Sequence, residues 1–263
     1  MKSCRTPYIC KPQMAYILHI DTSGETGLVA LAHKGQLLSV IENTDTRNHA
    51  ATLNINIEAL LAQHNISLQG LDALCVCGGP GSYTGLRIGL ATAKGFCYAL
   101  NKPLMMHNKL LLLAVNHMKS NLAENIVSIL PARDKEYFAA VYNWELNIIK
   151  EPQHLHQADL EAFTAGLQAN FLCAGYMDEA IKLAFDNKIS GYSDTTSPDM
   201  AAWAQYSCQQ FLCNDFVNLA NSEPFYLKQV YTHKPKIINF FPWKMIQIKG
   251  VGTKNFHFNP ARV

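Results

Sequence analysis

The sequence predicts a soluble α/β protein built from two related lobes, and three observations lead to this prediction. The 263 residues are 49% apolar and 16% charged, which is typical of one large or two small globular domains. Apolar segments of strand type alternate with segments of helical periodicity, and the order of strands, helix, strand and helix occurs twice. No apolar run is long enough to cross a bilayer.

The first half opens with a three-strand meander. A buried segment is followed by the polar turn DTSGETG, and the next two strands flank a turn at Lys34 and Gly35. An amphipathic helix comes next, because its apolar residues recur at helical spacing. We expect strands at 15–20, 28–33, 37–42, 71–77 and 103–106, and helices at 49–64, at 84–100 and in a Leu-rich segment ending near 119.

The second half partly repeats this order. Two strands flank the turn PARDKE, and a helical segment, a short buried strand and two further helices follow. Pro198 suits the first turn of the last helix. We expect strands at 126–130, 137–144, 146–149 and 171–174, and helices at 158–165, 177–185 and 197–215.

Charge is distributed unevenly. The net charge is +2, yet the last 40 residues carry +7 because no acidic residue follows Glu223. A basic segment can contact nucleic acid, but lysine runs are weak signals, and a solvated tail with a few hydrophobic anchors is the preferred interpretation. The eight cysteines form no CxxC pair, which favours reduced thiols and a cytoplasmic protein. The N-terminal segment lacks the apolar region of a secretory signal.

The first candidate site is the turn at Asp21, Thr22 and Ser23. Hydroxyl and backbone N–H groups in a turn between two strands can hold a phosphate, and an aspartate there can hold a metal ion or a water molecule. Asp, Ser and Gly are also the ordinary residues of turns, so the motif by itself is weak.

The second candidate site is the glycine-rich segment GGPGSYTG, which precedes a helix. Gly79 and Gly81 permit a tight turn, and Ser82 and Thr84 can cap the helix. The N-terminus of a helix favours an anion, although a tight strand-to-helix crossing explains the same residues. The segment lacks the lysine of a P-loop.

Small residues follow at intervals of four inside this helix, at Gly85, Gly89 and Ala93. Glycine costs about 1 kcal/mol relative to alanine in a helix interior, so this stripe predicts close packing on a neighbour. The neighbour is either another subunit or the core of the chain itself. No catalytic motif accompanies these features: the sequence contains no nucleophile elbow, no HExxH and no histidine pair at i, i+4 spacing.

Three segments in order, ILHIDTSGETGLVAL, GPGSYTGLRIGLATAKG and PARDKEYFAAVY, resemble the TsaB family, also called YeaZ. The resemblance covers about residues 14–231. It implies an actin/Hsp70-like (ASKHA) fold and a role in making threonylcarbamoyladenosine in tRNA. In this family the protein is a non-catalytic dimerisation partner of the catalytic subunit TsaD, and the ATPase TsaE joins them.

The residues support this division of roles. The catalytic relative carries an HxxxH metal pair, and the alignment places those two positions at Lys109 and Leu113. Neither residue can bind a metal ion as the histidines do. Pro131 stands where the family has an aspartate, whereas Arg133 matches the family pattern. We therefore expect no metal site and no catalytic residue.

The resemblance also implies an organisation and a partner surface. We expect an N-terminal extension at 1–13, lobes at 14–120 and 121–235, and a basic tail at 236–263. The expected partners are a TsaD-like subunit, a TsaE-like ATPase and tRNA through the complex, with a homodimer as an option for the isolated chain and no membrane. The expected partner surface comprises Leu53, Ile57, Gly85, Leu86, Arg87, Gly89, Leu90 and Ala93.

No cofactor is firmly expected. ATP or ADP would bind weakly, or at the complex interface, through Asp21, Thr22, Ser23, Gly79, Gly81, Ser82 and Thr84. Two enzymatic alternatives remain: a small-molecule kinase of the same fold, and a glycoprotease-like metalloenzyme. The kinase alternative needs a second, typically acidic phosphate motif, and this chain has PARDK there.

Overall fold

The computed structural model describes residues 15–45, 48–117, 124–167, 170–185 and 188–228. The chain divides into one unit at Met1–Gln229 and a second at Val230–Val263, so the expected extension at 1–13 and tail at 236–263 lie outside the described residues. None of the helices within the described ranges is long and apolar enough to cross a membrane. The six cysteines in these ranges are free thiols.

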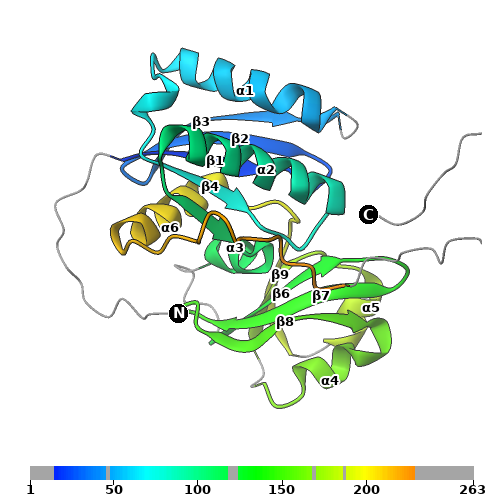
Figure 1. Ribbon diagram of the computed structural model, residues 1–263. Helices are drawn as coiled ribbons and strands as arrows, with labels where there is room; N and C mark the ends of the chain where they lie inside the picture. Colours follow the sequence, from blue (N-terminus) through cyan, green and yellow to red (C-terminus); the bar gives the residue numbers. More distant parts are fainter. Residues whose placement is uncertain (1–14, 46–47, 118–123, 168–169, 186–187, 229–263) are drawn as a thin grey trace, which may run out of the picture. The chain divides into compact units, whose positions relative to one another are not determined.

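The first lobe is built on a five-stranded sheet of order β3-β2-β1-β4-β5 (Figure 1). One face is covered by two helices, whose apolar side chains, such as Leu90, form a core with alternate residues of the sheet, such as Leu18 and Leu74. The elements are β1 (Tyr16–Asp21), β2 (Gly27–His33), β3 (Gln36–Asn43), α1 (His49–Gln63), the 3-10 turn η1 (Leu68–Gly70), β4 (Ala73–Cys77), α2 (Tyr83–Leu100) and β5 (Leu104–His107).

The second lobe is built on a five-stranded sheet of order β10-β9-β6-β7-β8. The short helices α4 and α5 cover one face, where Phe163 and Ile181 join the core. The elements are α3 (Lys109–Val115), β6 (Asn125–Pro131), β7 (Glu136–Asn143), β8 (Ile148–His156), η2 (Gln157–Asp159), α4 (Leu160–Thr164), β9 (Phe171–Gly175), α5 (Glu179–Ala184), β10 (Ile189–Asp194) and α6 (Met200–Leu212).

The two sheets have the same topology. In each, the first three strands are antiparallel neighbours, and the first strand also pairs in parallel with the fourth, which pairs in parallel with the fifth. The prediction of two related lobes is therefore confirmed, although their sequences are dissimilar.

Helices α3 and α6 form the layer between the two sheets (Figure 1). Leu110 and Leu113 of α3 pack with the second sheet, whereas Leu112 of the same helix joins a cluster of the first. Trp203 of α6 is fully buried against the first sheet. Both lobes thus pack on these helices. The expected lobe boundary between residues 120 and 121 assigns α6 to the second lobe by sequence, although α6 packs on the first sheet.

Two buried histidines hold α6 on the first sheet. His19 lies 2.7 Å from the Ser207 hydroxyl, and the Trp203 indole N–H donates to His107 at 2.9 Å. Burial lowers the pKa of His19 to about 4, and burial together with the nearby His19 lowers that of His107 to about 3. Both imidazoles are therefore neutral in the folded protein at physiological pH.

We expect this pair to make the fold acid-sensitive. The folded pKa values lie below the unfolded value of 6.5, so the stabilisation is complete above pH 6.5 and is lost as pH falls towards 4. At about 1.4 kcal/mol per pKa unit, the fall in pKa from 6.5 to about 4 means that His19 alone accounts for about 3–4 kcal/mol. Urea unfolding across this pH range measures the loss, and His19→Gln should flatten the pH dependence. An unchanged slope in that variant would contradict the assignment.

Candidate functional site at the glycine loop

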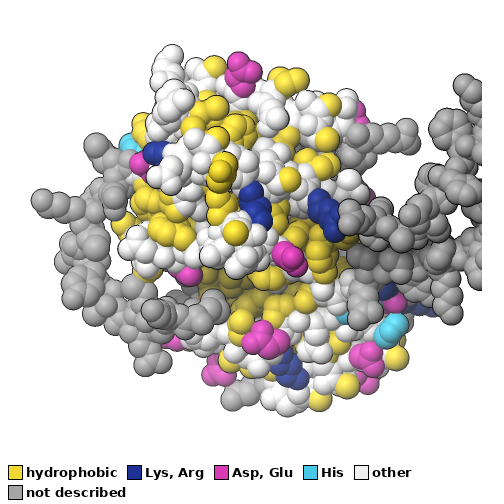
Figure 2. Space-filling model, viewed as in Figure 1, with side chains coloured by type: hydrophobic (Ala, Val, Ile, Leu, Met, Phe, Trp, Pro, Cys, Tyr) yellow, Lys and Arg dark blue, Asp and Glu magenta, His cyan; other side chains and the backbone are white. Residues whose placement is uncertain are grey.

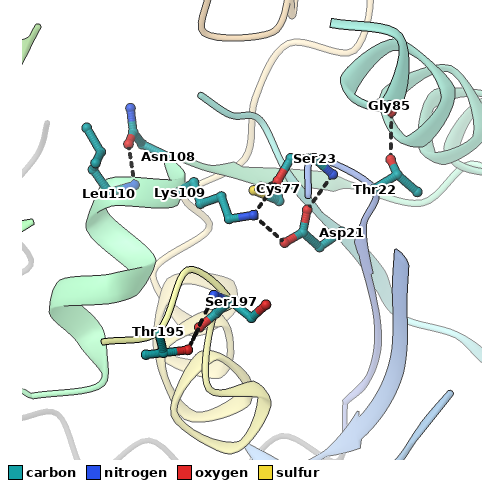
Figure 3. Close-up of polar contacts among 10 residues, drawn as sticks. All are labelled: Asp21, Thr22, Ser23, Cys77, Gly85, Asn108, Lys109, Leu110, Thr195 and Ser197. Atoms are coloured by element: carbon teal, nitrogen blue, oxygen red, sulfur yellow. Dashed lines mark hydrogen bonds and ion pairs between the residues drawn. The ribbon is translucent and has the colours of Figure 1, made fainter. Parts of the chain in front are cut away.

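The first candidate turn is buried and engaged by the chain itself. Asp21, Thr22 and Ser23 are exposed by 1%, 2% and 3%. The Thr22 hydroxyl donates to the Gly85 carbonyl at 2.6 Å, and the Ser23 N–H donates to the Asp21 carboxylate at 2.8 Å (Figure 3). The hydroxyl and N–H groups expected to bind a phosphate are therefore already engaged in hydrogen bonds within the chain.

A lysine fills the space in front of this turn. The Lys109 ammonium lies 2.9 Å from the Ser23 hydroxyl and 3.5 Å from the Asp21 carboxylate (Figure 3). Lys109 is only 4% exposed, and it stands at the first position of α3, which Asn108 caps by accepting from the Leu110 N–H. This buried ion pair is the main electrostatic feature of the site.

This role of Lys109 was not predicted from the sequence. The resemblance indicates only that Lys109 stands where the catalytic relative has a metal-binding histidine. The available signal was a single charge at the head of the apolar run KLLLLAV, because a lysine in such a run is rarely buried without a partner.

The glycine loop, residues 78–82, packs directly on the same turn. The Ser82 N–H donates to the Ser23 carbonyl at 2.8 Å, and a Cβ added at Gly81 would lie 2.4 Å from that oxygen. On the other side, the Lys109 N–H donates to the Gly79 carbonyl at 2.6 Å. Ser82 also caps α2 by accepting from the Gly85 N–H, as expected. The glycines here allow backbone to approach backbone.

Residues 216–228 form a segment, here termed the C-terminal strap, that returns to the first lobe and covers this loop. The Phe225 N–H donates to the Gly78 carbonyl at 2.8 Å, and the Phe225 ring lies 2.8 Å from where a Gly78 Cβ would stand. The Lys94 ammonium donates to the carbonyls of Ala220 and Ser222. The glycine loop is thus enclosed between the first turn and the strap.

The expected phosphate site is therefore divided in two. Asp21, Thr22 and Ser23 lie inside, and Gly79 is buried beneath the strap. The remaining expected residues, Gly81, Ser82 and Thr84, are exposed at the N-terminus of α2. In this arrangement an anion reaches the helix end but not the buried turn, where the Asp21 carboxylate would also repel it.

The small-residue stripe of α2 faces the chain's own sheet, so the expectation that it faces a partner is wrong. A Cβ added at Gly85 would lie 1.9 Å from the Thr22 carbonyl oxygen, and one at Gly89 would lie 2.4 Å from the Thr22 hydroxyl. Ala93 is fully buried in the first core. The stripe brings α2 onto the end of β1.

The same correction applies to most of the expected partner residues. Leu53, Ile57, Leu86 and Leu90 are 1–5% exposed, because they are the core-facing positions of α1 and α2. Arg87 is exposed. Helical periodicity identified the apolar faces correctly, but these faces cover the first sheet.

Other apolar side chains of α1 and α2 are exposed to solvent. Ile55 is 64% exposed and Tyr98 is 84% exposed. A hollow of about 470 Å³ lies between the two helices and the segment after α1. It is lined by Asn54, Ile57, Glu58, Leu61, Ala62, Ile66, Ser67, Leu68 and Phe96.

The hairpin of the second lobe is open to solvent. Pro131, the last residue of β6, and Arg133, in the turn that follows, are both exposed. Next to it, the Glu136 carboxylate pairs with Lys228 of the strap and with His154 at 3.0 Å, and these contacts lower the pKa of Glu136. Within the described ranges, no group of three or more His, Cys, Asp and Glu side chains could hold a metal ion.

Solved structures share this architecture. A protein from Pseudomonas aeruginosa described as similar to peptidase YEAZ superposes with a TM-score of 0.70 at 22% identity, covering 82% of this chain and all of that one. A structure of YeaZ from Pseudomonas aeruginosa gives a TM-score of 0.66 at 23% identity, with 81% and 100% coverage. The fold therefore defines a two-lobed α/β protein of the same architecture as these YeaZ structures.

Sequence comparison narrows this class to a family. The family model described as "TsaD: tRNA N6-adenosine threonylcarbamoyltransferase" matches residues 36–234. Relatives named "tRNA threonylcarbamoyladenosine biosynthesis protein TsaB" are 33% identical over 126 residues in Haemophilus influenzae and 30% identical over 131 residues in Escherichia coli. These alignments cover 48% and 50% of this chain and 53% and 56% of the relatives. The chain spans about half the length of the curated relatives it matches, and it belongs to the TsaB (YeaZ) branch of this family.

Proposed function

We propose that this chain is a non-catalytic subunit in the biosynthesis of threonylcarbamoyladenosine in tRNA, where it binds and activates a TsaD-like catalytic subunit. One observation supports it above the others. The Lys109 ammonium occupies the position where the resemblance places the first metal-binding histidine of the catalytic relative. Because Lys109 forms a buried ion pair with Asp21, the residue at this position stabilises the fold and does not bind a metal ion.

The outer face of α1 and α2 is the proposed contact with the TsaD-like subunit. It combines exposed apolar side chains, Ile55 and Tyr98, with a shallow hollow beside the polar Glu58 and Asn54. Such a mixed surface suits an interface whose partners also exist apart in water. A second copy of the chain would use the same face in the absence of the partner, and a TsaE-like ATPase completes the proposed cytoplasmic assembly.

We expect Ile55→Asp to weaken binding of the TsaD-like subunit by at least about tenfold, because a charge would be buried at the contact. Binding is measured by pull-down and calorimetry with the purified TsaD-like protein of the same organism. Leu183→Asp is the matched control, since Leu183 is 79% exposed on α5 of the other lobe. Normal binding by the Ile55 variant, or equal loss in both variants, would contradict this surface.

The kinase alternative needs nucleotide phosphates to reach the glycine loop. The buried turn, Lys109 and the strap fill that space in the folded chain. We therefore propose that nucleotide binding by the chain alone is weak, and that any ATP or ADP site is completed only at the interface with the partner. ATP turnover by the purified chain at an enzymatic rate would support the kinase instead.

A further inference from the structure

The C-terminal strap contacts both lobes of the protein. The Val217 N–H donates to the Leu104 carbonyl at 2.9 Å, which binds the start of the strap to the edge of the first sheet. At the other end, Leu227 packs against the core that α3 forms with the second sheet, and the Lys228 ammonium pairs with the Glu136 carboxylate of β7. In Figure 1 the strap is the orange segment that runs from α6 past α2 to β7. The strap therefore connects the two lobes.

Two further contacts hold the strap next to its last residues. The Arg87 Nε–H donates to the Tyr226 hydroxyl at 3.1 Å, and the Arg87 guanidinium stands 4.2 Å from the centre of the Tyr83 ring. The Phe225 N–H donates to the Gly78 carbonyl at 2.8 Å. Arg87 is exposed, and Figure 2 shows Lys and Arg side chains among hydrophobic ones on the face that carries α2. Neighbouring residues of the strap thus contact α2, the glycine loop and the second lobe.

The ion pair between the strap and the second lobe is easily broken. The Lys228 side chain is 33% exposed and the Glu136 side chain is 15% exposed, and ion pairs near the surface contribute little to stability and are screened by salt. Glu136 also closes the turn after β6, because its N–H donates to the Arg133 carbonyl at 2.9 Å and its carbonyl accepts from the Ala132 N–H at 2.8 Å. The two residues inside this turn have φ angles of 43° and 63°, in the left-handed region that L residues rarely adopt. The turn is therefore strained, and the contact of Glu136 with the strap helps to hold it.

We propose that residues 225–228 form a releasable clasp that joins the start of α2 to the turn after β6, so that a change at Arg87 alters the stability of this turn. When the clasp opens, the contacts with Arg87, Gly78 and Glu136 break together, and the cover of the glycine loop lifts with them. The clasp is thus a two-state element whose equilibrium is biased from both lobes. Because α2 carries part of the surface proposed for the TsaD-like subunit, the clasp would carry the binding of that subunit to the second lobe. This last consequence rests on the proposed function, whereas the clasp itself does not.

The test follows amide hydrogen exchange by NMR in the full chain, under conditions in which the exchange rate reports the opening equilibrium. The reporters are the N–H groups of Phe225, Ala132 and Glu136, which are all hydrogen-bonded in the closed clasp. Lys228→Gln should accelerate exchange of all three by the same factor, up to about fivefold, because that is the contribution of a partly exposed ion pair. Lys228→Arg keeps the charge and should exchange as the natural chain does. Raising NaCl to about 1 M should accelerate exchange in the natural chain but not in Lys228→Gln, because salt screens the pair.

The coupling to α2 is tested at Arg87. Arg87→Ala should accelerate exchange of the Ala132 and Glu136 amides as well as that of Phe225, by about fivefold, because it removes a hydrogen bond of the clasp. Circular dichroism establishes that each variant is folded. Where Arg87→Ala is not, Tyr226→Phe takes its place, because it removes the same hydrogen bond and keeps the ring. Lys182→Gln breaks an exposed ion pair on α5 and is the control, which should leave all three amides at their natural rates.

Equal acceleration of the three amides in Lys228→Gln and in Arg87→Ala would support the clasp. Three results would overturn it: acceleration of Phe225 alone, which means local fraying of the strap; a turn that responds to Lys228→Gln but not to Arg87→Ala; or no response at any of the three amides. The proposed function fails separately, because these measurements need no partner. Ile55→Asp should leave the three amides at their natural rates, and a TsaD-like subunit that does not bind the natural chain would disprove the proposed function without changing them.

Discussion

Lys109→Met is expected to lower the free energy of unfolding by about 3–5 kcal/mol. The substitution retains most of the side-chain volume but leaves the Asp21 carboxylate, 1% exposed, without its ammonium partner. The Ser23 hydroxyl loses its hydrogen bond from the same group. The loss of stability arises from the buried Asp21 carboxylate that is left without a partner. In the intact pair, the Coulomb attraction roughly offsets the cost of removing both charges from water.

A double-mutant cycle tests this account by urea unfolding. Asp21→Asn alone should also destabilise the protein, because it leaves the buried Lys109 ammonium without its carboxylate partner. The double variant should be less destabilised than the sum of the two single variants. Lys182→Met is the control, because Lys182 pairs with Glu179 on the surface and its loss should change stability by less than about 0.5 kcal/mol. A Lys109→Met protein within that margin would show that the ion pair contributes nothing.

The alternation of apolar segments predicted most elements of the fold within a few residues. The first lobe follows the expected order, because its strands β1, β2 and β4 are buried on both faces and its helices have a clear apolar side. The second lobe was less predictable. β8 continues to His156 although the sequence from Glu151 is polar, and β10 was not expected, because both are edge strands whose side chains remain partly exposed.

The candidate site was predictable only in its location. The sequence indicated that the turn after β1 and the glycine loop belong together, and they are in contact. It could not indicate that Lys109, 88 residues after Asp21, reaches the same point, because that contact depends on the pairing of β1, β4 and β5. The strap was also missed, since residues 216–228 show neither helical nor strand periodicity and are held by side chains of α2.

Because the small-residue stripe of α2 faces the chain's own sheet, alanine substitutions along it should destabilise the protein to different degrees. We expect Gly85→Ala to destabilise the protein by more than about 4 kcal/mol, a range reached only by severe core defects. The added Cβ would stand 1.9 Å from a backbone oxygen of Thr22, so either α2 or the end of β1 must move. That movement would break the hydrogen bond from the Thr22 hydroxyl to the Gly85 carbonyl.

Substitutions at two other glycines of α2 serve as comparisons for the stability of the Gly85 variant. Gly89→Ala meets the Thr22 side chain at 2.4 Å, which can rotate away, and should cost about 1–3 kcal/mol. Gly95→Ala meets nothing within 4 Å and should stabilise by up to about 1 kcal/mol, because alanine is the better helix former. Urea unfolding measures the series, and the yield of soluble protein ranks any variant too unstable to titrate. Equal stability of the Gly85 and Gly95 variants would mean that the stripe faces away from β1. The loss of stability should be largest for the Gly85 variant, smaller for the Gly89 variant and absent for the Gly95 variant. This order is expected only if Gly85 and Gly89 are needed for the close approach of α2 to the turn at residues 21–23.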